Sequence, residues 1–323
     1  MRIDRMLALG ASLLVLASAC TTGGGSPTPG VTATPTSAAS ATPTVGPPPT
    51  IRIGSAGFYE ARLMGEMYAQ VLEAHGYTVE RQLGLGTRSI VQTALQSGQI
   101  DLVPEYIGST LEFLNKGKGE ASNDPSATAT KLQEYLTPLG ITALGYTPGE
   151  DQNGFAVRQD TADRLSLATM SDLAPVSKDL VLGAPPECET NPVCLPALKS
   201  VYGIEFKDYK KLDACAPDGV TALINDAIDV YEVCTTQPGI TQFGLVLLED
   251  DKHVQPAENI AALVRDDYLA KLGDPVAFKV LLNQLSAGID TATLLALGVK
   301  VDVDKEDIDQ VAREYLQSRG LVP

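Results

Sequence analysis

The chain has 323 residues, 44% of them hydrophobic, which is enough to bury the core of one large domain or two medium ones. Its 24 Lys and Arg residues stand against 40 Asp and Glu residues, and the net charge of −16 argues against a nucleic-acid binder and a polybasic membrane-surface protein. The apolar content excludes wholesale disorder, and no apolar run after the first twenty residues approaches the roughly 18 needed to span a bilayer.

Residues 1–19 have the pattern of a signal peptide. Arg2 and Arg5 precede an apolar run at residues 7–16, and three small residues end at Ala19. Cys20 follows directly, which resembles the lipobox of bacterial lipoproteins, where the new terminal Cys is lipidated. An ordinary secretory signal is the alternative. Both predict export to a compartment that permits disulfides, and lipidation predicts anchoring to the outer, extracytoplasmic or periplasmic face of the cytoplasmic membrane.

Residues 20–50 are expected to form a linker. Between residues 21 and 50 no residue is charged, and 24 of the 30 positions are Thr, Pro, Gly or Ser. Such a segment cannot bury enough apolar surface to fold, and its prolines favour extended backbone. We therefore expect a tether between the lipid-modified Cys and a folded body that begins at Ile51.

Strand and helix patterns alternate from Ile51 onward. Alternating or buried apolar runs predict strands at 51–54, 78–82, 100–103, 141–146, 155–158, 180–182, 229–233 and 245–248. Helical periodicity marks residues 63–72 and 89–96, and a last helix is expected from Asp304, as N-cap, to Ser318. This alternation predicts an α/β fold of βαβ units with predominantly parallel sheets, either as one barrel or as two doubly wound lobes.

Motifs for enzymatic chemistry are missing from the sequence. The two histidines, His75 and His253, have no Ser, Cys or His partner at a catalytic spacing, and neither G-x-S-x-G nor H-E-x-x-H occurs. We expect no enzyme, no cofactor and no metal site. The loop from Gly84 to Arg88 is either a flexible connection or a loop that faces a ligand.

The four cysteines after Cys20 form an even set in a chain expected to be exported. Three pairings are possible. We favour Cys188–Cys194, which closes a short loop, and Cys215–Cys234, because both of these residues end predicted strands separated by one helix. Since no C-x-x-C occurs, a redox-active dithiol or a zinc site is not expected.

Four segments, in this order and spacing, carry a family resemblance: Phe58-Tyr59-Glu60, Leu85-Gly86-Thr87-Arg88, Pro104-Glu105-Tyr106-Ile107-Gly108-Ser109 and Leu248-Glu249-Asp250-Asp251-Lys252. They resemble the substrate-binding proteins of osmoprotectant (glycine betaine/choline) ABC importers, and the resemblance covers residues 51–323. It implies a two-lobe, periplasmic-binding-protein-like fold of type II with two hinge crossings. One lobe comprises residues 51–150 and the return segment 238–323, and the other comprises residues 151–237.

In this family a quaternary ammonium ion lies in a cage of aromatic rings, whose faces attract a cation that cannot donate hydrogen bonds. The resemblance places Tyr106 and Phe155 at the first two cage positions. It places Cys234 at a third, and Glu258 or Asn259 near a fourth. The ligand-binding residues that it implies are Tyr106, Phe155, Ser109, Glu105, Phe58 and Glu258.

The chain departs from the family at the positions that bind a ligand carboxylate. The Lys and Arg of the family fall on Ala56 and Asn191, whereas Glu60, Glu105 and Glu258 keep negative charge near the ligand. We therefore expect a cationic ligand without a carboxylate, such as choline or another amine. The resemblance also implies a monomer that delivers this ligand to a permease in the cytoplasmic membrane. A lipoprotein of the same fold with a sensory or adhesive role is the alternative.

Overall fold

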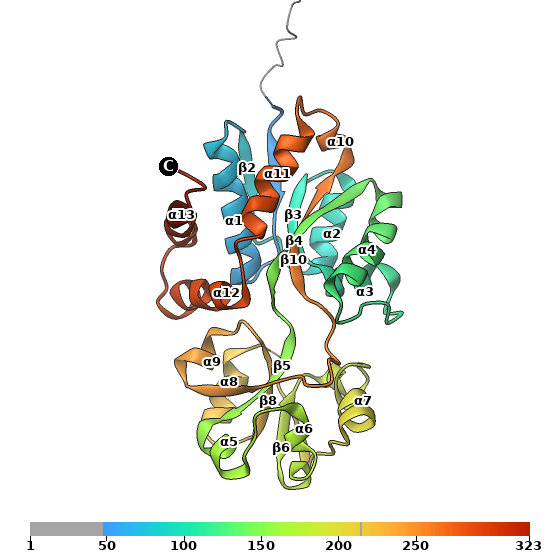
Figure 1. The fold of residues 1–323 in the computed structure, drawn as a ribbon, viewed down its shortest axis with the longest axis vertical. Coiled ribbons are helices and arrows are strands. Elements are labelled where there is room, and N and C mark those ends of the chain that lie inside the picture. Colours follow the sequence, from blue (N-terminus) through green and yellow to red (C-terminus); the bar gives the residue numbers. More distant parts are fainter. Residues whose placement is uncertain (1–47, 214) are drawn as a thin grey trace, which may run out of the picture. The chain divides into compact units, whose positions relative to one another are not determined.

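Two five-stranded sheets organise the folded body of the protein. The structure is a computed structural model that describes residues 48–213 and 215–323 (Figure 1). One sheet has the strand order β2-β1-β3-β10-β4 and the other has the order β7-β6-β8-β5-β9. Each sheet forms the centre of one α/β lobe, as the family resemblance implies. The predicted signal peptide, Cys20 and most of the linker lie outside the described residues.

The sheet of lobe 1 combines strands from two distant parts of the chain. Its strands are β1 (Ile51–Gly54), β2 (Val79–Gln82), β3 (Leu102–Tyr106), β4 (Ile141–Glu150) and β10 (Asn259–Arg265). β1 runs parallel to β2 and β3, whereas β10 runs antiparallel to β3 and β4, between which it lies. The prediction of predominantly parallel sheets is therefore wrong in detail. The returning strand enters from the other lobe, so it runs opposite to its neighbours.

Helices cover both faces of this sheet. They are α1 (Tyr59–Ala74), α2 (Arg88–Ser97), α3 (Ile107–Asn115), α4 (Pro125–Leu136), α10 (Asp266–Leu269), α11 (Pro275–Ser286), α12 (Thr291–Gly298) and α13 (Ile308–Ser318). Side chains of α1, α11, α12 and α13 form one apolar core, and those of α2, α3 and α4 form another. α1 includes the predicted helical residues 63–72 and ends at Ala74, with His75 as its C-cap; the His75 Nδ1 atom lies 2.8 Å from the Val71 carbonyl oxygen.

Lobe 2 repeats the same layered plan. Its strands are β5 (Asn153–Arg158), β6 (Val181–Ala184), β7 (Asp208–Lys211), β8 (Val230–Cys234) and β9 (Leu245–Leu248). Its α-helices are α5 (Gln159–Leu165), α6 (Met170–Leu173), α7 (Leu195–Ala197), α8 (Pro217–Ile224) and α9 (Pro238–Gln242). β5 is antiparallel to both β8 and β9, and β6 is parallel to β7 and β8.

Two crossings connect the lobes. The first is the short link Asp151-Gln152 between β4 and β5, and the second is the segment 249–258 between β9 and β10. The two crossings are hydrogen bonded to each other: the Asp151 N–H donates to the Glu258 carbonyl oxygen (3.1 Å), and the Gln152 side chain donates to the Pro256 carbonyl oxygen (2.9 Å). The predicted lobe boundary after residue 237 is too early, because α9 and β9 pack in lobe 2.

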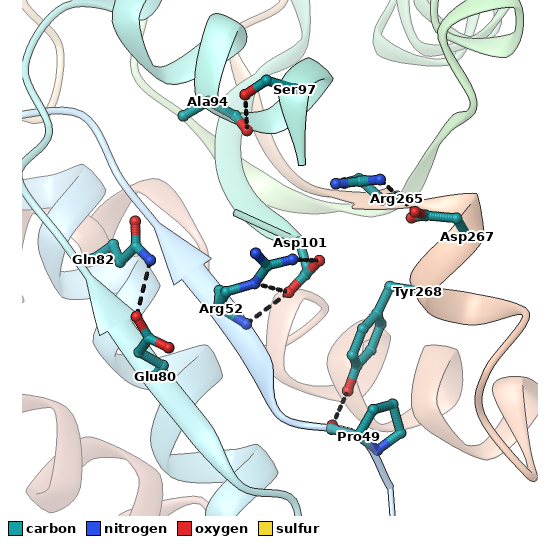
Figure 2. A network of polar contacts seen from close by, with 10 residues as sticks. All are labelled: Pro49, Arg52, Glu80, Gln82, Ala94, Ser97, Asp101, Arg265, Asp267 and Tyr268. Carbon is teal, nitrogen blue, oxygen red and sulfur yellow. Dashed lines mark hydrogen bonds and ion pairs between the residues drawn. The ribbon is translucent and has the colours of Figure 1, made fainter. Parts of the chain in front are cut away.

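Polar contacts tie together the edge of lobe 1 where β1 begins (Figure 2). The Arg52 guanidinium donates two hydrogen bonds to the Asp101 carboxylate, of 2.8 and 2.7 Å, and the Arg52 backbone N–H donates a third. The Tyr268 hydroxyl donates to the Pro49 carbonyl oxygen (3.1 Å). These contacts hold β1 beside the start of β3, which helps to place the opposite end of β3, where Tyr106 lies.

Two local predictions at the helix and strand ends are wrong. The last helix begins at Ile308 with Asp307 as its N-cap, because the chain first makes a wide helical turn at Val299–Val303 that ends at Asp304. Cys215 does not end a strand: β7 stops at Lys211, and β6 lies between β7 and β8.

No single helix in residues 48–213 or 215–323 has the length and apolar composition of a membrane span. One pair bent by 75°, Pro275–Ser286 with Thr291–Val303, meets that description only when its two helices are taken together.

Candidate functional site

A cavity of about 850 Å³ is lined by both lobes and by both crossings. Lobe 1 contributes the start of α1, the end of β3, the start of α3 and the end of the wide helical turn Val299–Val303. Lobe 2 contributes the loop before α8, the end of β8, and α9. Its charged lining residues are Glu60, Arg88, Glu112, Asp151, Glu258, Asp302 and Lys305. Carboxyl groups therefore outnumber cations in the lining by five to two, as expected of a site for a cation.

Aromatic rings line the wall of lobe 1. The rings of Phe58 and Tyr106 are stacked, with centroids 6.0 Å apart and planes inclined by 23°. Phe58 is 46% exposed, whereas Tyr106 is 8% exposed and also contacts the core of lobe 1. Tyr59 lines the same wall, and its hydroxyl donates to the Thr236 carbonyl oxygen across the cavity (3.1 Å). This arrangement offers aromatic surface to a cation.

Glu60 lies in the first turn of α1 and is 2% exposed. The Tyr106 hydroxyl donates a hydrogen bond to its Oε1 atom. Burial and the charge of Asp151 raise the pKa of Glu60 to about 8, although the Tyr106 and Thr236 hydroxyls lower it. Burial also raises the pKa of Asp151 in the first crossing. At neutral pH the empty cavity therefore retains a proton on this pair of carboxyl groups.

Glu258, in the second crossing, meets the start of α3. Its carboxylate accepts hydrogen bonds from the Ser109 backbone N–H (3.0 Å) and hydroxyl (2.7 Å). The contact is possible because residue 108 is Gly: a Cβ there would lie 2.6 Å from the Ala257 carbonyl oxygen. Burial raises the pKa of Glu258 to about 7, and the Ser109 bonds lower it. The cavity thus contains a third carboxyl group with a raised pKa, beside Glu60 and Asp151.

Both favoured disulfides are confirmed, and they hold the wall of lobe 2. Cys215–Cys234 lines the cavity itself, and Cys188–Cys194 closes the loop that contributes Asn191 and Val193. Cys188 and Cys194 lie within 4.8 Å of a Glu232 carboxylate oxygen, a possible metal-binding group. Because their sulfurs are bonded to each other, they offer no thiolate to a metal in this state.

Arg88 shows what the Gly-rich loop at 84–88 does. Gly84 and Gly86 have positive φ angles of 76° and 125°, which lets the loop turn tightly against Ser55. The loop leads into α2 and places Arg88 in the cavity lining, where its Nε atom donates to Glu105 (3.0 Å). The loop therefore contributes to the site, although its one cation is already paired.

Four of the six predicted ligand-binding residues line this cavity: Tyr106, Ser109, Phe58 and Glu258. Phe155 does not. It lies on β5, is 3% exposed and packs in the core of lobe 2. Glu105 is also outside the lining, since Arg88, Gln92 and Thr110 donate hydrogen bonds to it inside lobe 1.

Sequence reasoning missed several lining residues. Asp151 and Thr236 join the acidic end of the cavity, and Tyr59 and Phe243 add aromatic surface. Asp151 could have been predicted from the sequence as a lining residue, because it is a charged residue at the predicted start of lobe 2, where a crossing faces the ligand. No comparable signal marks Phe243, which is exposed because α9 ends there.

Comparison with known proteins agrees with this geometry. Residues 49–318 match the model of the family described as the substrate binding domain of ABC-type glycine betaine transport system. The chain belongs to this family. The family description is that of a transport binding domain, and not of an enzyme.

Two relatives and one solved structure illustrate the family. A glycine-betaine-binding protein of Pseudomonas aeruginosa is 29% identical over 84% of this chain and 89% of its own length. A carnitine transport binding protein, OpuCC of Listeria monocytogenes, is 29% identical over 84% of this chain and 87% of its own length. The crystal structure of a glycine betaine/carnitine/choline ABC transporter protein has the same fold, with a TM-score of 0.74, 22% identity, and coverage of 84% of this chain and 99% of that one.

Proposed function

We propose that this chain is the extracytoplasmic binding component of an ABC importer, exported and attached to the membrane through a lipid on Cys20. It captures a small cationic amine without a carboxylate in the cavity between its lobes and delivers it to a membrane permease. No chemical step on the ligand is involved. The observation that carries this proposal is the acidic, aromatic-lined cavity, in which Glu60, Asp151 and Glu258 lie beside Tyr106.

The charges of the cavity argue against a zwitterionic betaine as the preferred ligand. A ligand carboxylate needs a cation, and the resemblance aligns the family's Lys and Arg with Ala56 and Asn191. Of the cations that line the cavity, Arg88 is paired with Glu105 and Lys305 with Asp302. Where Glu60, Asp151 and Glu258 are ionised, they would repel a ligand carboxylate placed beside them.

The test is calorimetric titration of the purified protein with choline, glycine betaine and carnitine. Choline is expected to bind at least about tenfold more tightly than the two carboxylate-bearing ligands, because like charges in a poorly solvated site cost several kcal/mol. A preference for glycine betaine would contradict the proposed ligand class. Failure of every amine to bind would remove the proposed role.

A variant locates the binding site. Tyr106→Leu keeps apolar volume but removes the ring face, so we expect choline affinity to fall about 2- to 30-fold, equivalent to about 0.5–2 kcal/mol. Tyr135→Leu, on α4 and outside the cavity lining, is the matched control and should leave the dissociation constant unchanged. Equal affinity in the two variants would place the ligand elsewhere.

A further inference from the structure

One oxygen atom in the cavity has no hydrogen-bond partner. The Glu60 carboxyl is 2% exposed and lines the cavity, and its Oε1 atom accepts from the Tyr106 hydroxyl. Its Oε2 atom is fully buried and makes no hydrogen bond of normal geometry within residues 48–213 and 215–323. A buried acceptor without a donor destabilises the folded protein by about 1–3 kcal/mol. A ligand that enters the cavity with a hydrogen-bond donor would remove this cost.

The neighbouring groups do not supply that partner. The Thr236 hydroxyl lies close enough to lower the pKa of both Glu60 and Asp151, but a hydroxyl has one proton and cannot serve two carboxyl groups at once. The Thr236 backbone N–H already donates to Asp151 Oδ1 (3.0 Å). The acidic pair therefore has more acceptor atoms than donors around it.

The two cationic side chains that line the cavity are paired with other carboxylates. Arg88 donates to Glu105, and Lys305 pairs with Asp302. Glu258 is held by Ser109 and lies in the other crossing. In the part of the chain that the structure describes, no Lys or Arg forms an ion pair with Glu60 or Asp151.

We infer that the ligand of this binding protein is a cation that carries an N–H or O–H donor, and that this donor bonds to Glu60 Oε2. The inference rests on the proposed function and narrows its ligand class. Protonated amines and hydroxyalkyl ammonium ions meet the requirement. An ammonium ion with four plain alkyl groups does not, because it leaves Oε2 buried without a donor. When the ligand binds, its donor replaces the proton that the raised pKa of Glu60 retains in the empty cavity.

The experiment compares matched ligands on the unmodified protein. Choline is titrated against propyltrimethylammonium, in which a methyl group replaces the hydroxyl, and trimethylammonium against tetramethylammonium, in which a methyl group replaces the N–H hydrogen. At a fixed pH of 8.5, we expect the donor-bearing member of each pair to bind about tenfold or more tightly, as hydrogen bonds to charged groups do.

Two variants then assign the effect to one residue. Glu60→Met has similar length and no acceptor, and we expect it to reduce the preference for the donor-bearing ligand to less than about threefold. Glu66→Met is the matched control on the same helix: Glu66 is equally buried but pairs with Arg81, away from this cavity, so the preference should persist.

Each outcome decides a different point. Equal affinity within each ligand pair on the unmodified protein overturns the inference and leaves the proposed function intact. A preference that survives in Glu60→Met overturns the assignment to Glu60. If none of the four cations binds, the proposed function itself fails, and the inference with it.

Discussion

The affinity for a permanently charged ammonium ligand is expected to fall steeply as the pH is lowered from 9 to 6. In the empty cavity the pKa of Glu60 is about 8, so the carboxyl is protonated at neutral pH. A cation binds better to the ionised form, and binding therefore releases a proton. By linkage, each pH unit below 8 weakens the apparent affinity by up to about tenfold, and above pH 8 the affinity levels off.

The other acidic groups around Glu60 should also weaken cation binding as the pH is lowered. Asp151, from the first crossing, also has a raised pKa, and Glu258, from the second, has a pKa of about 7. The Tyr59 and Tyr106 hydroxyls, from α1 and β3, stay protonated because burial raises their pKa. Farther along the lining, Arg88 donates a hydrogen bond to Glu105, and Asp302 lies near Tyr59.

The measurement is a series of choline titrations between pH 6 and pH 9, since choline itself does not titrate there. Glu60→Gln should flatten the profile. The ligand-free protein provides a second check. The pKa of Glu60 in the folded protein lies above its ordinary value of 4.5, so the free energy of unfolding of the protein should decline as the pH rises from 4.5 to 8. A dissociation constant that is constant between pH 6 and pH 9 would contradict the proposed proton release.

Removal of the Cys215–Cys234 disulfide is expected to cost about 3 kcal/mol of unfolding free energy. The bridge spans 19 residues and includes α8, so its loss frees a long loop in the unfolded chain. The Cys215→Ser/Cys234→Ser double variant should also bind choline more weakly, because both cysteines line the cavity.

Urea unfolding followed by circular dichroism measures this loss. The matched control is the Cys188→Ala/Cys194→Ala variant, whose bridge spans only 6 residues and should contribute less to the unfolded-state entropy, about 2 kcal/mol. Both assays are run without a reducing agent, so that the remaining disulfide stays intact. If removal of the Cys215–Cys234 bridge lowers the free energy of unfolding by less than about 1 kcal/mol, packing and not the disulfide positions the wall of lobe 2.

Local patterns in the sequence predicted most of the strands and a few of the helices that the structure describes. The strand at residues 51–54, the helix around residues 63–72 and the strand at residues 245–248 have sequence patterns that repeat within a few residues, so neighbouring positions alone reveal them. Short spacing favoured the Cys188–Cys194 pairing, and the Cys215–Cys234 pairing was correct although the strand argument for Cys215 was wrong. The motif around Tyr106 identified the family, because several short segments in fixed order are specific together.

The place of β10 in the sheet of lobe 1 could not be predicted in the same way. β10 is a continuous apolar run that lies between β3 and β4, about 110 residues later in the chain than β4. Its place depends on the chain leaving for lobe 2 and returning. The position of Phe155 has a related cause: successive strand residues point to opposite faces, and the pairing of β5 with β8 and β9 turns this ring into the core.

The sequence by itself determined the class of this protein and the acidic and aromatic residue types that a cation site needs, and it favoured the two disulfide pairings that the structure contains. Only the tertiary structure decided which of these acidic and aromatic residues lie together in one cavity. Glu60, Asp151 and Glu258 lie far apart in the chain and come together because α1 starts at the cavity while the other two residues stand in the two crossings. Burial at that junction, which no local pattern encodes, raises the pKa of each carboxyl group, so the empty cavity retains a proton that a bound cation displaces.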